Sequence, residues 1–470
     1  MKKGKRLISL LLVCCLLMGC MPMAARAEET TEPGSASGTC GENATWSYDA
    51  ETATLTISGT GEMEDYGEIS PPYNHWREFA KTITIAPGIT SIGPGAFAGF
   101  SVCTAVNIPD SVKKIGKTAF FRCYKLPSVS IPDGVEYVGS GAFDECEGLT
   151  SVEMADSVTE IGDSAFGFCR RLASVKLSKG LKKIGVWAFC GATALTSVEI
   201  PAGIEELSGF NSCYNLTTVI IPEGVTSLGP AAFSGCRDLY AIEVPKSVKQ
   251  IDVTSFESCG WLTVYGEKGS YMETFAKENN IRFSVGKIPD SSSVLSQFKD
   301  VFAGEYYSDA VIWASLRSIT AGTDDTHFSP NGSCTRAQAV AFLWRAVGRP
   351  ETMGEGSIFS DVKSGEYYEK AVRWAAENNV TAGTGSEKFS PDAVCTRAQI
   401  VTFLWRAARE PAPEYSKIIF TDIEAGSYYE KAVQWAVEQG ITAGTGAGKF
   451  SPDSKCTRAQ IVSFLYRSKG

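Results

Sequence analysis

The stretch Ile131–Met154, IPDGVEYVGSGAFDECEGLTSVEM, contains the unit from which most of this chain is built. Its parts recur every 23 residues, except in one copy that is two residues shorter. The phenylalanine of the unit recurs at Phe97, Phe120, Phe143, Phe166, Phe189, Phe210, Phe233 and Phe256. A fixed period of this length indicates stacked units, each too small to bury its own apolar face.

Each unit favours a strand, a turn and a return segment. Val152 and Met154 alternate with polar neighbours, which is the period of a half-buried strand. Val158 and Ile161 begin the return segment, and Phe166 is expected to enter the core. Strands in a sheet lie about 4.8 Å apart, so eight such units predict a rod roughly 40 Å long.

The repeat resembles the leucine-rich repeats of the BspA-like type, which occur on bacterial surface proteins. The resemblance covers about residues 83–286 and rests on seven or eight copies of IP..V..IG..AF..C..L..V. Residues 40–82 do not repeat, and their alternating TLTISG run resembles the N-terminal β cap of such arrays. The segment GSYMETFAKENNIRF predicts a short helix and a strand that close the stack as a C-terminal cap within residues 83–286.

The N-terminus has the pattern of an export signal. Basic residues precede a short apolar run, and Ala25 and Ala27 provide a cleavage site, so residues 1–27 are predicted to be a signal peptide. A lipoprotein signal is the alternative, because Leu17–Cys20 resembles a lipobox. We favour cleavage after Ala27, because Met18 is unusual in that motif.

The rest of the chain has the composition of an exported acidic protein. Removal of residues 1–27 leaves 39 basic and 53 acidic residues, a net charge of about −14, which argues against nucleic acid or an anionic membrane surface as a partner. No other stretch is apolar enough to predict a transmembrane segment. Residues 28–39 and 287–297 are polar and are predicted to be linkers.

The twelve cysteines that follow the signal do not have the spacing of a disulfide framework. Six of them lie three residues after the phenylalanine of a unit, at Cys123, Cys146, Cys169, Cys213, Cys236 and Cys259, and Cys334, Cys395 and Cys456 share one position of a second repeat. A cysteine kept at one position of a stacked unit behaves as a small buried hydrophobe, so we predict free thiols. Disulfides between neighbouring units stay open as the alternative.

The last 173 residues carry a second repeat with a period of 61 residues. Each copy contains, in order, Phe-x-Asp, Tyr-Tyr, a tryptophan, T-A-G-T, F-S-P and C-T-R-A-Q, which predicts repeats at residues 298–358, 359–419 and 420–470. The apolar spacing around each tryptophan predicts a helix with one buried face. Threonine followed three residues later by glutamine predicts a capping box at the start of a second helix.

This second repeat resembles three S-layer homology (SLH) domains, which hold exported proteins on bacterial envelopes. The resemblance implies an all-α pseudo-threefold trefoil around a central helical bundle. It also implies binding to a secondary cell-wall polysaccharide, often through a pyruvylated amino sugar. The family's TRAE motif is TRAQ here, which leaves the identity of the ligand open. The predicted fold class is therefore an α+β multidomain chain, a leucine-rich-repeat β-solenoid followed by an all-α SLH trefoil.

Nine residues, three from each copy, are predicted to bind the wall glycan. The arginine after each capping threonine lies where a positive charge meets the positive end of the helix dipole. This unfavourable placement suggests an anion site made by the arginine and exposed helix-end N–H groups. An ion pair between each arginine and a carboxylate of a neighbouring copy is the alternative. The predicted site residues are Arg336, Arg397, Arg458, Asp300, Asp361, Asp422, Gln338, Gln399 and Gln460.

The sequence predicts no enzyme. His75 and His327 are the only histidines and lie in different domains, without the partners of a triad or a metal site. No Walker loop, GxSxG motif, EF-hand or paired zinc-ligand spacing occurs. We therefore expect neither a cofactor nor a metal.

Two functions remain for a secreted protein of the bacterial cell wall. In the first, the solenoid recognises a protein or glycan while the SLH domains hold the chain on the wall, as in an adhesin. In the second, the chain is a structural component of the S-layer or an envelope scaffold. The outward strand positions show no self-complementary patch, which favours recognition.

Overall fold

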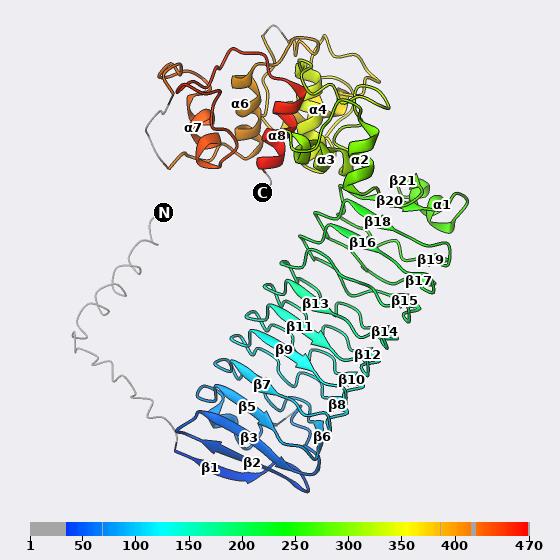
Figure 1. Ribbon diagram of the computed structural model, residues 1–470, viewed down its shortest axis with the longest axis vertical. Coiled ribbons are helices and arrows are strands. Elements are labelled where there is room, and N and C mark those ends of the chain that lie inside the picture. The colour runs from blue at the N-terminus through cyan, green and yellow to red at the C-terminus, as the bar shows by residue number, and fades with distance from the viewer. Residues whose placement is uncertain (1–33, 68, 386, 415–419, 469–470) are drawn as a thin grey trace, which may run out of the picture.

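The computed structural model describes residues 34–67, 69–385, 387–414 and 420–468. Stacked strands form a long rod, and a group of helices lies at its C-terminal end (Figure 1). The rod and the helical domain have separate hydrophobic cores, the first running from Cys40 to Ala276 and the second from Val294 to Leu465. The predicted signal peptide lies outside the described residues.

Antiparallel strands begin the rod. β1 (Ala36–Thr39) pairs with β2 (Ala44–Asp49), which pairs with β3 (Thr54–Gly59). β3 then pairs in parallel with β5 (Thr82–Ile85), so these strands cover the first repeat unit. The predicted linker at residues 28–39 is wrong over its last four residues, because backbone pairing with β2 holds them in the sheet.

Parallel strands of successive units run along the rod in two series. The longer strands are β5, β7 (Ala105–Asn107), β9 (Ser128–Ile131), β11 (Ser151–Met154), β13 (Ser174–Lys176), β16 (Thr218–Ile220), β18 (Ala241–Glu243), β20 (Thr263–Gly266) and β21 (Arg282–Val285). The strands of the second series, most of which have two residues, are β4 (Gly61–Glu62), β6 (Ile89–Ile92), β8 (Lys114–Ile115), β10 (Tyr137–Val138), β12 (Glu160–Ile161), β14 (Lys183–Ile184), β15 (Glu206–Leu207), β17 (Ser227–Leu228) and β19 (Gln250–Ile251). Val152 pairs with Val129 on one side and Val175 on the other, so the sequence period of 23 is the register between units.

The repeated phenylalanines form one continuous stack through the core. From Phe97 to Phe256, neighbouring ring centroids lie 5.0–6.2 Å apart, with interplanar angles of at most 20°. Glycine allows the close approach of successive turns, since a Cβ on Gly162 would lie 2.5 Å from the backbone nitrogen of Ser140. The β-solenoid predicted from the repeat is thus confirmed.

The cysteines of the unit lie beside this stack as free thiols. The Sγ of Cys146 donates to the carbonyl oxygen of Phe120 at 3.2 Å, and that of Cys169 donates to Phe143 at the same distance. Each thiol thereby binds the preceding unit. Burial raises the pKa of Cys259 to about 12, so this thiol stays protonated at neutral pH.

Two helices and a turn complete the rod and its junction. α1 (Tyr271–Glu278) is capped by Ser270 and buries Met272 and Phe275 against the last units. α2 (Ser291–Gln297) occupies most of the predicted linker at residues 287–297, which is a second correction. The helix forms because Asp290 caps it and Val294 joins the core of the helical domain. The short 3-10 helix η1 (Asn74–Trp76) lies in the N-terminal cap.

The helical domain contains one helix pair from each copy of the second repeat. The pairs are α3 (Ser308–Leu316) with α4 (Arg336–Ala346), α5 (Glu369–Glu377) with α6 (Arg397–Ala407), and α7 (Glu430–Glu438) with α8 (Arg458–Arg467). Each first helix packs on the second helix of another copy: α3 on α8, α5 on α4 and α7 on α6. None of the helices in the described ranges has the length and apolar character needed to cross a membrane.

Candidate functional site

A reciprocal capping box begins the second helix of each copy, as predicted. In the first copy, the Thr335 hydroxyl accepts from the Gln338 backbone N–H at 3.2 Å. The Gln338 side-chain oxygen accepts from the Thr335 backbone N–H, also at 3.2 Å. The same pair of bonds forms in the other copies, between Thr396 and Gln399 and between Thr457 and Gln460. The three glutamines therefore support the helix start.

The helix-end N–H groups that the sequence left exposed are occupied by a neighbouring copy. The backbone N–H of Arg336 donates to the carbonyl of Ala393 at 2.9 Å, and that of Ala337 donates to Pro391 at 3.0 Å. Equivalent bonds hold the starts of α6 and α8. The prediction of an open helix-end anion site is therefore wrong, because loops from other copies already supply the acceptors.

The three arginines at the helix starts are buried. Arg336, Arg397 and Arg458 are only 3–4% exposed. The Arg336 Nε donates to the carbonyl of Phe389 at 2.9 Å, and its guanidinium carbon lies 4.9 Å from the Phe389 ring centroid and 5.5 Å from that of Phe403. Burial lowers the pKa of all three arginines. Each guanidinium is thus held by a carbonyl and two rings.

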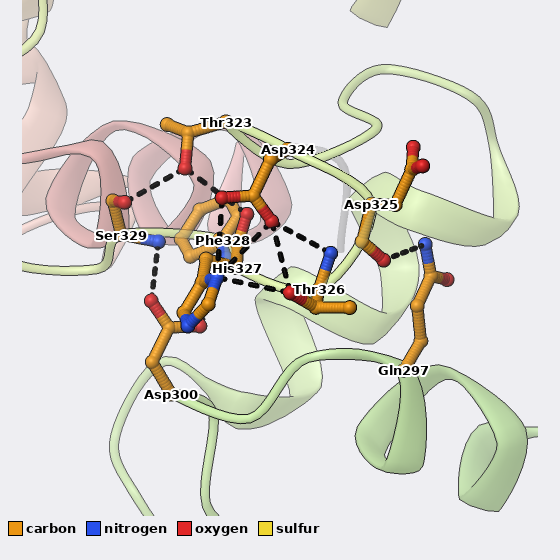
Figure 2. Close-up of polar contacts among 9 residues, drawn as sticks. All are labelled: Gln297, Asp300, Thr323, Asp324, Asp325, Thr326, His327, Phe328 and Ser329. Atoms are coloured by element: carbon orange, nitrogen blue, oxygen red, sulfur yellow. Dashed lines mark hydrogen bonds and ion pairs between the residues drawn. The ribbon is translucent and has the colours of Figure 1, made fainter.

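The three aspartates hold the same loops from the other side, and Figure 2 shows the first of them, Asp300. The Asp300 carboxylate accepts from the backbone N–H groups of Phe328 and Ser329 at 2.8 and 2.7 Å. The carbonyl of Phe328 accepts from Nε of Arg458 at 2.8 Å. One phenylalanine therefore joins an aspartate of its own copy to an arginine of another. The same arrangement joins Asp361 to Arg336 through Phe389, and Asp422 to Arg397 through Phe450.

This geometry also corrects the predicted alternative of an ion pair. Among the residues with described positions, no salt bridge joins any of these arginines and aspartates. Partial burial opposes ionisation of Asp361 and Asp422, but the two backbone donors outweigh it and the pKa of each carboxyl is lowered. The aspartates therefore shape the loop as charged acceptors.

The loop itself is closed by side chains of its own copy. The hydroxyls of Thr323 and Ser329 lie 2.8 Å apart, and the Thr323 backbone N–H donates to the carbonyl of His327 at 2.7 Å (Figure 2). His327 Nδ1 lies 3.0 Å from the Asp324 carboxylate, on the surface of the loop. His327 is therefore a surface residue of the loop. In the described parts of the chain, no cluster of residues has the composition of a metal site.

Exposed tyrosines lie beside this framework. The first tyrosine of each pair, Tyr306, Tyr367 or Tyr428, is 54–60% exposed. Partial burial raises the pKa of Tyr306, although a side-chain hydrogen bond with Thr457 of another copy opposes the shift. Each of these tyrosines also lies within electrostatic range of an arginine of another copy: Tyr306 of Arg397, Tyr367 of Arg458 and Tyr428 of Arg336. The sequence showed the Tyr-Tyr pair in every copy. It did not show that the first tyrosine is exposed at the boundary between two copies, which we call a seam.

Comparison with protein families accounts for both repeats. The profile of the BspA type leucine rich repeat region matches residues 77–178, 136–263 and 206–319, which together span more than half of the 470-residue chain. The chain belongs to this family. The profile of the S-layer homology domain matches residues 358–401 and 419–462, which lie in the second and third copies of the helical repeat. Both families are surface or anchoring domains.

Relatives of this BspA-type protein carry similar segments in longer chains. A "Cell surface protein" of Thermoanaerobacter kivui is 34% identical over 28% of this chain and 17% of that protein. A "Cellulosome-anchoring protein" of Acetivibrio thermocellus is 28% identical over 30% of this chain and 33% of that protein. The match thus spans a third or less of each relative. A solved leucine-rich repeat protein from Eubacterium ventriosum covers 57% of this chain at 19% identity, with a TM-score of 0.29.

These matches place the protein at the bacterial cell surface. An "S-layer protein" of Bacillus thuringiensis subsp. finitimus is also similar, with 23% identity over 42% of this chain and 24% of that protein. The predicted localisation at the cell wall or surface is therefore confirmed, as is the combination of BspA-type repeats with SLH domains.

Proposed function

We propose that the helical domain anchors the protein non-covalently to a secondary cell-wall polysaccharide and that the rod is displayed for recognition. In this proposal residues 298–358 are a third SLH domain. Its support is that Asp300, Phe328 and Arg458 make the same contacts as their equivalents in the two copies that match the family profile. The proposal contains no catalytic step.

We also propose that the three copies form the pseudo-threefold trefoil implied by the family resemblance. A closed ring of backbone hydrogen bonds supports it. The N–H of Cys334 donates to Cys456, that of Cys456 donates to Cys395, and that of Cys395 donates to Cys334, at 2.8–3.0 Å. Each copy therefore bonds to both others, which distributes three equivalent seams around one axis.

The observation that carries the proposed function is the exposed tyrosine at each seam. Its ring offers an apolar face, and a capped helix and a buried arginine of other copies lie beside it. Nη2 of Arg336 and Nη2 of Arg397 have no hydrogen-bond partner among the described residues. Both atoms are buried, so each arginine contributes its positive charge beneath the seam rather than a direct contact. An acidic sugar substituent, such as a pyruvyl ketal, is the ligand group that this charge attracts. Three seams would add avidity beyond that of one.

Sedimentation with purified cell walls tests this assignment. The full chain carrying Tyr306→Ala, Tyr367→Ala and Tyr428→Ala is expected to bind walls at least about tenfold more weakly, because all three seams lose their exposed ring. The matched control is Phe302→Lys, which removes a 62% exposed ring and installs the residue found at the equivalent position, Lys363.

A triple variant that folds normally and sediments with walls like the parent would overturn the tyrosine seams as the binding site. Walls depleted of pyruvyl groups, compared with untreated walls, then test the acidic substituent. Equal binding to both kinds of wall would exclude pyruvate as the recognised group.

A further inference from the structure

Two aromatic side chains project from the turn edge of the rod, defined here as the turns that contain the repeated phenylalanines. Trp187 is 53% exposed and Phe168 is 46% exposed. They belong to neighbouring units, whose core rings Phe166 and Phe189 are 5.4 Å apart. The two residues are 19 positions apart and do not share one position of the unit, so the repeat pattern gave no signal for this pair.

Both aromatic residues have a backbone conformation that bulky residues rarely adopt. The φ angle of Trp187 is +63° and that of Phe168 is +51°. At the position of Trp187 the two preceding units have Gly141 and Ser164, also with positive φ. A large exposed ring at such a position contributes nothing to the core, and strained residues of this kind gather at ligand sites.

The row of residues directly after the core phenylalanines lies, along each unit, between the Trp187 position and the Phe168 position. Asp144, Gly167, Cys190 and Asn211 occupy the same position, one residue after the core phenylalanine, in four successive units. The Asn211 side-chain amide donates to Cys190 Sγ at 3.0 Å. Asp144 Oδ1 and Asn211 Oδ1 have no hydrogen-bond partner within the described ranges. These two oxygens are themselves buried, but both side chains are half-buried as a whole, so the row presents part of a carboxyl group and part of an amide at its surface.

Backbone contacts place the rings on either side of this row. The N–H of Cys190 donates to the carbonyl of Trp187 at 2.9 Å, which closes a turn with Trp187 on one side. A Cβ on Gly191 would lie 3.1 Å from Cδ1 of Phe168, so the Phe168 ring leans over that glycine on the other side. A Cβ on Gly167 would lie 2.7 Å from Asp144 Oδ1. Because glycine has no side chain, Gly167 and Gly191 leave the surface beside the two rings uncovered.

We propose that this part of the turn edge binds a carbohydrate chain. A sugar ring has an apolar C–H face that packs on an aromatic ring, and hydroxyl groups at its edge that donate to carboxylate and amide oxygens. A protein hot spot would instead have a continuous apolar centre, whereas here glycine, cysteine and polar residues separate the rings. Tyr214, 37% exposed and covered by the Arg237 guanidinium at 4.7 Å, continues the edge in the next unit.

This inference rests on the proposed function only in that the helical domain displays the rod. It names the ligand class for the recognition surface, which the proposed function leaves open. The two rings lie in neighbouring units, so a ligand that contacts both must be longer than one sugar, which suits an oligosaccharide chain.

Sister units supply substitutions that the fold tolerates. Trp187→Ser installs the residue of Ser164, and Phe168→Ser installs that of Ser212, which also has a positive φ of 57°. Calorimetry and tryptophan fluorescence of the full chain are measured with hexasaccharides of β-1,4-linked glucose, xylose and N-acetylglucosamine. We expect the parent to bind at least one of them and each variant to bind it at least about tenfold more weakly. Val253→Ser, which changes another exposed side chain of the rod, is the matched control and should bind like the parent.

The outcomes separate this inference from the proposed function. If the parent binds none of the three hexasaccharides, or if either variant binds as the parent does, the carbohydrate site is wrong. If the parent binds a protein from which all glycans have been removed, and the variants lose that binding, then the ligand is a protein and the proposed ligand class is wrong. Wall sedimentation of the Trp187→Ser variant should equal that of the parent, because the seam tyrosines are intact. If neither protein sediments with walls while the parent still binds a hexasaccharide, the proposed anchoring fails and the carbohydrate site stands.

Discussion

The rod and the helical domain are both built from sequence repeats, but one repeat is stacked in a line and the other is closed in a ring. In the rod, the Phe143 ring stacks on the rings of the units before and after it, with centroids 5.0 and 5.3 Å apart. In the helical domain, Arg458 binds the carbonyl of Phe328, which is 130 residues away. A linear array needs caps at its ends, whereas a closed ring has no ends and makes every copy depend on the others.

The largest expected effect comes from breaking the phenylalanine stack in its middle. Phe143→Ala removes a fully buried ring with two stacked neighbours, so we expect a loss of about 3–5 kcal/mol in the free energy of unfolding. Urea denaturation followed by circular dichroism measures it. Phe256→Ala, at the end of the stack, is the matched comparison and should cost less, because that ring is 7% exposed and has one stacked neighbour. Equal losses at both positions would contradict a linear array.

A somewhat smaller loss in the free energy of unfolding is expected from a substitution in the helical domain, where the three copies close on one another. Arg397→Ala leaves the buried carbonyl of Phe450 without its donor and opens a cavity between two rings, which should cost about 2–4 kcal/mol. Unfolding of the helical domain is followed by tryptophan fluorescence, since each copy has a tryptophan in its first helix. Arg397→Lys should not restore stability, because an ammonium lacks the planar face that packs between the rings. If Arg397→Ala leaves the stability unchanged and only weakens wall binding, the arginine contributes to ligand binding and not to the stability of the helical domain.

The smallest expected effect comes from the cysteines, whose substitution should change the free energy of unfolding by a similar amount in both regions. Cys146→Ala in the rod and Cys395→Ala in the ring each remove one buried thiol, and we expect about 1–2 kcal/mol for either. Intact-mass alkylation of the unfolded chain, without reductant, counts the thiols. Twelve reactive thiols after residue 27 are expected. Blocked cysteines in either region would contradict the free-thiol assignment and show that the two regions are cross-linked differently.

The sequence by itself determined every feature that depends on spacing along the chain. A period of 23 residues specifies which residues pair between units, as Val129, Val152 and Val175 do, because each unit repeats the geometry of the last. The capping boxes at Thr335, Thr396 and Thr457 were likewise predictable, because both partners lie within three residues. α2 escaped prediction because its single buried residue, Val294, finds its core only in the folded helical domain.

Only the tertiary structure decided what the site residues do. The sequence placed Arg336, Arg397 and Arg458 correctly at helix starts, but closure of the ring buries them against loops of other copies. The same closure leaves Tyr306 and its equivalents exposed, although their neighbours Tyr307 and Tyr368 are buried. Whether a side chain is covered depends on segments that can lie more than a hundred residues away. A local pattern of charge and hydropathy does not predict such a distant contact. The exposure of side chains at the seams and at the turn edge is therefore known only from the tertiary structure.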